Sequence, residues 1–283
     1  IFINGVTFIK EVDMFINECS ASYKYSKLMN IELPNKKAKE LGLKNSHFVT
    51  PHGLDEEEHY TTAYELALIA DYALDNPKIA EVVKTKTYTV RINNNTKTIN
   101  NTNELLGYLD GVNGVKTGFT NGAGRCLVTS VERDGFNIIT VVLGADTKKI
   151  RTKDSIKLIE YIYSNYELVN LEQIINEHFN EWKKFNQKRI EIYKGKKDNV
   201  EVNLEEYKYK FYPVKKEKIK DISIEIRNVQ MHFEAPVNME EEVGILTLSV
   251  GDKELMNIKI LTNNTVERKE IKDYIFESLK SII

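Results

Sequence analysis

Hydrophobic and polar positions in the first 166 residues follow a helical period in some segments and a strand period in others. Asn35–Gly42 has the pattern of a short helix, and Gly42 ends it because glycine readily adopts the left-handed conformation found after helices. Thr62 and Glu65 have the spacing of a capping box, which predicts the start of a longer helix that Asn76–Pro77 ends. The apolar face predicted for that helix comprises Ala63, Leu66, Ala67, Ala70, Ala73 and Leu74.

Three segments in the same half have strand character. Thr85–Ile92 is rich in threonine, valine and tyrosine, and ends at a run of asparagines. Arg125–Glu132 and Phe136–Gly144 are apolar runs that flank Arg133-Asp134-Gly135, which predicts a β-hairpin. Asp154–Tyr166 returns to helical spacing. The first half is therefore predicted to be a mixture of helices and antiparallel strands.

The pattern changes near Tyr166. A polar helical stretch, Leu171–Phe185, leads into a series of short strands, two of which alternate with period two at Ile222–Ile226 and Ile245–Val250. The predicted strands are Arg189–Tyr193, Asn199–Leu204, Tyr207–Tyr212, Ile222–Arg227, Val243–Val250 and Leu255–Leu261. Regularly spaced short strands favour a small all-β sandwich. We therefore predict domains at residues 1–166 and 167–265.

A third segment, residues 266–283, is predicted to be an amphipathic helix. Its apolar face comprises Ile271, Tyr274, Ile275, Leu279 and Ile282, and its polar face comprises Lys272, Asp273, Glu277 and Lys280. Two interpretations are open. The helix from residue 267 onward either lies on a membrane surface, or packs against the core of the protein or frays at the terminus.

Composition and charge limit the classes of function that the sequence supports. The 283 residues contain 40 Lys+Arg against 42 Asp+Glu, for a formal net charge of −2, which gives no support to a nucleic-acid partner. The two cysteines, Cys19 and Cys126, have no metal-binding or redox spacing. The chain begins with isoleucine, so we expect a processed product or a fragment, and the apolar opening IFINGVTFI is too short to span a membrane.

The stretch GVKTGFTNGAG, from Gly114 to Gly124, combines groups that could hold an extended peptide. Lys116 supplies a point charge for a carboxylate, and the Thr117 hydroxyl can donate to the same group. Gly118 leaves room for a ligand backbone beside the strand, and the Phe119 N–H is placed to stabilise an oxyanion. Taken alone, Lys-Thr-Gly is also compatible with an ordinary turn before a strand.

The surrounding motifs make this stretch more specific. LGLKNSHFVTPHGLDEEEHYTTAYELALIA, followed by DGVNGVKTGFTNGAGRCLV and later by FEAPVNMEEEVGILTLSVGDKEL, resembles the D-alanyl-D-alanine carboxypeptidases, or low-molecular-weight penicillin-binding proteins. The resemblance runs from about Lys36 to the end of the chain. It implies an α/β (α+β) penicillin-binding/beta-lactamase-like domain with an antiparallel sheet and helices, incomplete at its N-terminus. A small all-β sandwich and a C-terminal amphipathic helix are expected to follow.

The resemblance also implies a reaction and a location. Members of this family remove the terminal D-alanine of the peptidoglycan pentapeptide through a serine nucleophile, a lysine base and an acyl-enzyme, and beta-lactams imitate the substrate. Lys116, Thr117, Gly118 and Phe119 match the substrate-binding strand, and Arg151, before the predicted helix at Asp154, matches an arginine near the substrate carboxylate. The expected location is the bacterial cell envelope, outside the cytoplasmic membrane and peripheral to it through residues 267–283. No cofactor or metal is implied.

The catalytic motifs of the family are not found in this sequence. No serine has a lysine three residues later, and no Ser-x-Asn occurs. Ser20 and Lys24 lie one helical turn apart, but no other family residue surrounds them. We therefore expect a truncated or degenerate member that penicillin does not acylate, which mass spectrometry after incubation with a beta-lactam would test.

Two alternatives follow from other features. A non-catalytic module that binds stem peptides or a partner would need only the Lys-Thr-Gly strand. A metal hydrolase would use His47, His52 and His59 with the acidic run Asp55–Glu58, but these histidines lack the spacing of a zinc motif.

Overall fold

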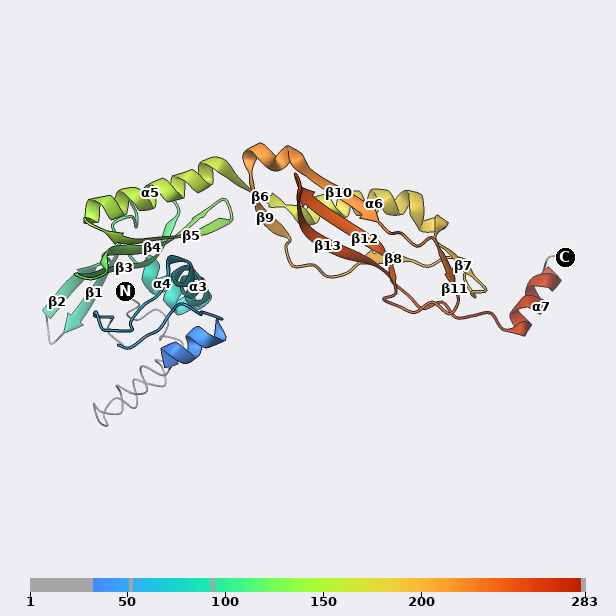
Figure 1. Ribbon diagram of the computed structural model, residues 1–283, viewed down its shortest axis with the longest axis horizontal. Helices are drawn as coiled ribbons and strands as arrows, with labels where there is room; N and C mark the ends of the chain where they lie inside the picture. Colours follow the sequence, from blue (N-terminus) through green and yellow to red (C-terminus); the bar gives the residue numbers. More distant parts are fainter. Residues whose placement is uncertain (1–32, 51–52, 93–94, 281–283) are drawn as a thin grey trace. The chain divides into compact units, whose positions relative to one another are not determined.

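The computed structural model describes residues 33–50, 53–92 and 95–280. The chain divides into two compact units, residues 1–164 and residues 165–283 (Figure 1). Each unit has its own hydrophobic core, so each is described separately.

The first unit is built on a three-stranded antiparallel sheet with the order β3-β4-β5. The strands are β3 (Val112–Thr120), β4 (Gly124–Arg133) and β5 (Phe136–Ala145). Asp134 and Gly135 both have positive φ, at 50° and 76°, as the tight turn between β4 and β5 requires. The predicted hairpin is therefore confirmed.

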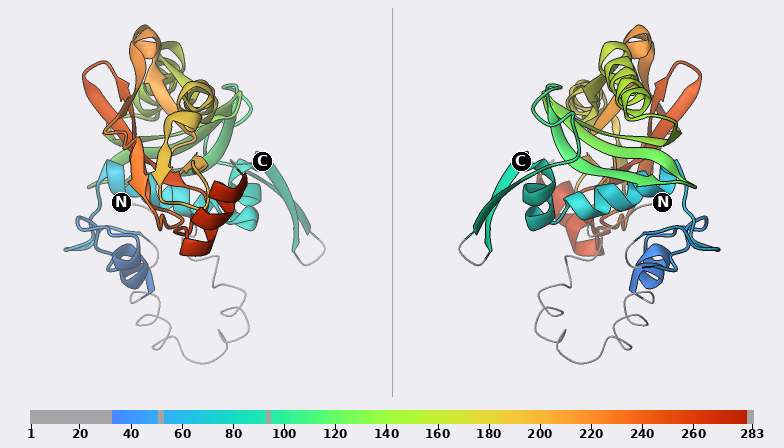
Figure 2. Two further views of the ribbon diagram at one scale, coloured as in Figure 1. Left: turned by 90° about the vertical axis from the view of Figure 1, so that its right-hand side faces the viewer. Right: turned by 90° about the vertical axis from the view of Figure 1, so that its left-hand side faces the viewer.

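Helices cover both faces of this sheet (Figure 2). On one face α3 (Ala63–Leu74) packs mainly against β5 and α4 (Pro77–Lys84) against β3, and on the other α5 (Lys148–Asn165) places Ile159 against Leu127 and Val131. The helix α4 was not predicted from the sequence. Asn76–Pro77 does end α3, but Asn76 also caps a new helix by accepting from the Lys78 N–H at 3.0 Å.

Three expectations for the first unit need correction. Ala63, which was predicted on the apolar face of α3, is exposed, whereas Ile69, which was not, is buried there. The Glu65 N–H donates to Thr62 Oγ1 at 3.2 Å, but the Glu65 carboxylate is occupied by the segment at residues 44–46 and does not complete the capping box. The helix predicted from Asp154 begins at Lys148, so Arg151 lies inside α5 and not before it.

Two further segments of this unit match the sequence pattern. A helix covers residues 33–40, and Gly42 follows it with a φ of +72°. The strands β1 (Thr87–Ile92) and β2 (Asn95–Asn100) form an exposed antiparallel hairpin. Residues 93 and 94 of the predicted asparagine turn lie outside the described residues.

The second unit combines strands with one long helix. A four-stranded sheet has the order β10-β12-β13-β8, β7 pairs in parallel with β11, and β6 pairs with β9. The elements are β6 (Tyr166–Asn170), α6 (Leu171–Asn186), η1 (Gln187–Arg189), β7 (Glu191–Tyr193), β8 (Val202–Leu204), β9 (Phe211–Lys215), η2 (Lys216–Asp221), β10 (Ile222–Arg227), β11 (His232–Glu234), β12 (Glu242–Val250) and β13 (Lys253–Thr262).

The helix α6 belongs to the core of this unit. Leu171, Ile175 and Phe179 lie in one buried cluster with Leu246 and Ile258 of the sheet. Their spacing along α6 is that of a helix with one buried face. The charged residues between them made this face difficult to recognise in the sequence. The strand predicted at Tyr207–Tyr212 is displaced to β9, and the short strands β6 and β11 were not predicted.

The last described helix, α7 (Ile271–Lys280), leaves its apolar side chains uncovered. Ile271 is 81% exposed, Ile275 56% and Leu279 54%, so the interpretation that this helix packs against the core is wrong for the described residues. The predicted residue Ile282 lies outside them. Among the helices that the structure describes, none is long and apolar enough to cross a membrane.

Candidate substrate-binding site

The Lys-Thr-Gly strand lies at an edge of the sheet in the first unit. Within the described residues β3 is hydrogen-bonded to β4 alone, with Thr117 opposite Leu127 and Gly118 opposite Cys126. An edge strand can pair with an extended peptide through its unpaired backbone groups. The edge position of β3 agrees with the prediction that this strand can hold an extended peptide.

Lys116 is available to an anion. Its side chain is half-buried, and its Nζ donates to the Thr117 carbonyl at 2.6 Å. Among the described residues, no carboxylate lies within ion-pair distance of Lys116. Burial, and after it the charge of Arg151, lowers the pKa of the Lys116 ammonium group. A carboxylate bound beside Lys116 would offset both effects, because it favours the charged form of the lysine.

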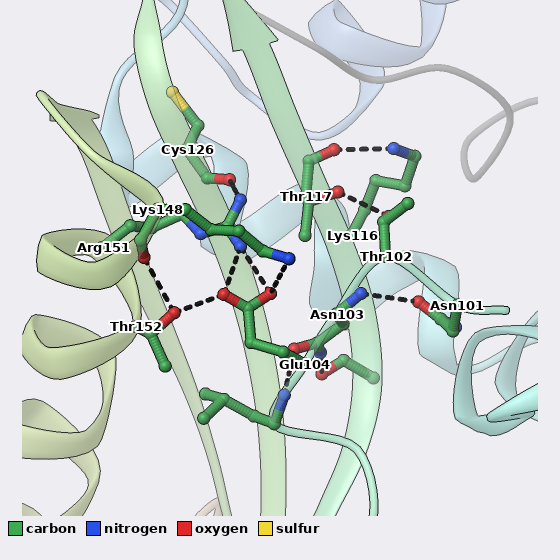
Figure 3. Close-up of polar contacts among 12 residues, drawn as sticks. Asn101, Thr102, Asn103, Glu104, Lys116, Thr117, Cys126, Lys148, Arg151 and Thr152 are labelled. Carbon is green, nitrogen blue, oxygen red and sulfur yellow. Dashed lines mark hydrogen bonds and ion pairs between the residues drawn. The ribbon is translucent and has the colours of Figure 1, made fainter.

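The Thr117 hydroxyl is held by the segment that precedes β3. Thr117 Oγ1 lies 2.6 Å from Thr102 Oγ1 (Figure 3). Asn103 fixes that segment by donating to the Gly114 carbonyl at 2.9 Å. Each hydroxyl has one proton and two lone pairs, so Thr117 can accept from Thr102 and still donate its own proton to a ligand.

Phe119 and Arg125 shape the exposed end of the strand. The Phe119 ring is 46% exposed, and the Arg125 guanidinium lies 3.6 Å from its centroid. This contact holds a hydrophobic ring beside the edge at which a ligand would lie. The role of the Phe119 N–H as an oxyanion donor stays a prediction, and so does the role of Gly118.

Arg151 is buried and paired. It is 3% exposed, and its Nη2 donates to both carboxylate oxygens of Glu104, at 2.7 and 2.6 Å. Its Nη1 lies 3.5 Å from the Cys126 carbonyl, and its buried Nε has no hydrogen-bond partner among the described residues. Arg151 therefore contributes a buried positive charge close to β4. Its contact with a substrate carboxylate stays a prediction.

Glu104 is a site residue that was not predicted from the sequence. Its carboxylate accepts from Arg151 and from the Thr152 hydroxyl, and Lys148 Nζ lies 3.9 Å away (Figure 3). Burial opposes ionisation of this carboxyl group, but the hydrogen bonds from Thr152, its own backbone and Arg151 outweigh burial and lower the pKa of Glu104. Glu104 and Arg151 are 47 residues apart, so no local pattern could have joined them.

The histidines do not form a metal site in the part of the chain that the structure describes. His47 Nδ1 lies 2.7 Å from the Glu58 carbonyl, and His59 Nδ1 accepts from the Val49 N–H at 3.0 Å. No group of three or more metal-binding side chains occurs among the described residues. His52, and the pair Ser20 and Lys24, lie outside them.

Comparison with known proteins agrees with the motifs. The family model for D-alanyl-D-alanine carboxypeptidase matches residues 23–147, and the model for the penicillin-binding protein 5 C-terminal domain matches residues 182–268. The chain is 36% identical over 218 residues to the D-alanyl-D-alanine carboxypeptidase DacF of Bacillus subtilis, which covers 76% of this chain and 52% of that protein. It is 29% identical over 224 residues to DacA of Escherichia coli, covering 79% and 52%. The chain thus spans about half the length of these relatives.

Solved structures show the same likeness. Penicillin-binding protein 5 of Haemophilus influenzae superposes with a TM-score of 0.62 at 26% identity, over 84% of this chain and 66% of that one. The carboxypeptidase DacD of Francisella tularensis gives a TM-score of 0.60 at 25% identity, over 86% and 71%. The resemblance drawn from the sequence is confirmed, and so is a penicillin-binding protein-like α/β fold with sheets and helices followed by a C-terminal domain.

Proposed function

This chain is related to the D-alanyl-D-alanine carboxypeptidases across both of its units, and we propose that its β3 edge binds the D-Ala-D-Ala end of peptidoglycan stem peptides. The observation that carries the proposal is Lys116, a cation on an edge strand with no carboxylate partner among the described residues. In this arrangement the ligand backbone pairs with β3, and its terminal carboxylate lies at Lys116 and the Thr117 hydroxyl.

The reaction associated with such a site is serine-type hydrolysis of the terminal peptide bond, with release of D-alanine, although the 283 residues contain no Ser-x-x-Lys to perform it. The strand supplies the binding half of that chemistry. Gly118 admits the ligand backbone, and the Phe119 N–H faces the developing oxyanion. The first unit would be the carboxypeptidase domain of this assignment, followed by a β domain at residues 167–265 and the helix at 266–283. Beta-lactams, as mimics of the substrate, are expected ligands of the same edge.

A second function is binding of stem peptides without cleavage. It is favoured by one observation, the absence of Ser-x-x-Lys from the 283 residues. Without a general base within hydrogen-bond reach of a nucleophile, a bound peptide is not cut.

One experiment separates these functions. The 283-residue chain is incubated with diacetyl-L-lysyl-D-alanyl-D-alanine, and binding is followed by calorimetry while free D-alanine is measured enzymatically. We expect binding without D-alanine release and no penicillin adduct by mass spectrometry. D-alanine release would establish the hydrolase for these residues, and the absence of binding would contradict both functions.

We propose further that α7 lies on a membrane surface, which would place the protein at the outer face of the cytoplasmic membrane, where its substrate occurs. The uncovered side chains of Ile271, Ile275 and Leu279 support this position. The chain is expected to sediment with phosphatidylglycerol vesicles, and Ile275→Asp is expected to abolish sedimentation. Ile150→Asp is the control, because Ile150 is an exposed isoleucine of α5. Equal sedimentation of both variants and the unaltered chain would contradict the proposal.

A further inference from the structure

Asp55 bonds to the turn that follows the Lys-Thr-Gly strand, although 65 residues separate it from Thr120. The Thr120 hydroxyl donates to Asp55 Oδ1 at 2.6 Å, and the Gly122 N–H donates to Asp55 Oδ2 at 3.1 Å. The same Thr120 oxygen accepts from the Ala123 N–H at 2.9 Å. Both oxygens of one carboxylate therefore hold the turn between β3 and β4.

The loop that carries Asp55 is itself fixed at its base. The buried Glu65 carboxylate accepts from the backbone N–H groups of Lys44 and Asn45, each at 2.9 Å, and from the Ser46 hydroxyl. Ser46 Oγ also lies 2.6 Å from Thr61 Oγ1, which closes the two ends of the loop onto each other. Asp55 therefore reaches the turn from an anchored segment.

The chemistry of the turn favours a carboxylate at this position, because a carboxylate offers an acceptor to each of two donors. Thr120 has one hydroxyl proton, and because the Ala123 N–H uses a lone pair of the oxygen, the proton is free for Asp55. The hydrogen bond from Thr120, aided by the Gly122 N–H and opposed by burial, lowers the pKa of Asp55. A Cβ at Gly122 would lie 3.1 Å from Asp55 Oδ2, so the close approach suits glycine.

We propose that Asp55 is a positioning residue for the substrate-binding strand, an inference that rests on the proposed function. We call the hydrogen bonds from Thr120 and Gly122 to Asp55 the clamp. Because Thr120 directly follows Phe119, the clamp fixes the end of β3 at which the ligand backbone and the oxyanion would lie. Within the described residues β3 is paired on one side only. An edge that frays must be ordered when the ligand binds, and this ordering weakens affinity. Asp55 does not touch the ligand in this arrangement.

The test uses the full chain and two measurements. Amide hydrogen exchange without ligand reports the order of residues 118–123, and calorimetry reports the affinity for diacetyl-L-lysyl-D-alanyl-D-alanine. Asp55→Ala is expected to accelerate exchange in this segment about tenfold and to weaken the affinity by a similar factor, because the substitution removes a charge-assisted hydrogen bond from the turn. Asp55→Asn keeps the acceptor for Thr120 and is expected to restore part of both. Glu57→Ala, an exposed carboxylate of the same loop, is the matched control and should change neither.

A double-mutant cycle separates the clamp from a general loss of stability. Thr120→Val removes the same bond from the other side, so its effect on affinity and that of Asp55→Ala should be less than additive. Unchanged exchange in Asp55→Ala, or faster exchange with unchanged affinity, would overturn the proposal. If the unaltered chain binds no peptide, the proposed function fails, and faster exchange in Asp55→Ala would still support the clamp.

Discussion

Replacing Glu104 with alanine is expected to lower the free energy of unfolding of the first unit by about 3–5 kcal/mol, the cost of leaving a buried charge without its partner. The Arg151 side chain is only 4% exposed, and its two shortest hydrogen bonds both end on Glu104. Alanine at position 104 would leave the Arg151 guanidinium with only the 3.5 Å contact to the Cys126 carbonyl among the described residues. Arg151→Leu should cost less, because the Glu104 side chain is 26% exposed and its carboxylate can be hydrated.

Urea unfolding of the full chain measures this effect. The single tryptophan, Trp182, lies in the second unit, so its fluorescence serves as an internal reference while circular dichroism follows both units. Glu132→Ala, at an exposed position of β4, is the control and should change little. An equal cost for Glu104→Ala and Arg151→Leu would contradict the argument from burial.

The same pair predicts a dependence of stability on pH. The pKa of Glu104 is lower in the folded chain than in the unfolded chain, so its contribution to stability is present above the unfolded pKa of about 4.3. That contribution is lost as the pH falls through the folded value. Stability should therefore fall less steeply in Glu104→Gln than in the unaltered chain as the solution is acidified below about pH 5.

Replacing Lys116 with methionine is expected to weaken binding of diacetyl-L-lysyl-D-alanyl-D-alanine by at least about tenfold. A hydrogen bond to a charged group contributes about 1.5–3 kcal/mol, and 1.4 kcal/mol corresponds to a factor of ten. Methionine keeps most of the aliphatic length of lysine and removes only the charge and the donors. The structure supplies no second amine that could replace Lys116 among the described residues of β3.

The free energy of unfolding of Lys116→Met distinguishes a loss of binding from a loss of folding. Burial and Arg151 lower the pKa of Lys116, which means that the fold disfavours its charge. Lys116→Met should therefore leave the free energy of unfolding unchanged or raise it, while affinity falls. Lys149→Met removes a lysine from the exposed surface of α5 and is the matched control. A change in affinity below about twofold for Lys116→Met would contradict the role of this lysine.

The sequence by itself determined the features that depend on neighbouring residues. Asp134-Gly135 specified the β4–β5 turn, because the turn needs two successive residues that tolerate positive φ. Asn76–Pro77 ended one helix, and Gly42 ended another. The motifs around Lys116-Thr117-Gly118 also indicated the resemblance to the D-alanyl-D-alanine carboxypeptidases, since their order along the chain is a property of the sequence alone.

Only the tertiary structure decided which polar side chains meet. Glu104 pairs with Arg151 across 47 residues, and Asp55 reaches Thr120 across 65. Glu65 had the right spacing for a capping box, yet its carboxylate accepts from the backbone N–H groups of Lys44 and Asn45 and from the Ser46 hydroxyl. A carboxylate accepts hydrogen bonds from the donors that folding places beside it. The residues near it in the sequence do not show which donors these are. Local backbone preferences can therefore be read along the chain, whereas long-range hydrogen bonds appear only once the sheet and its helices are assembled.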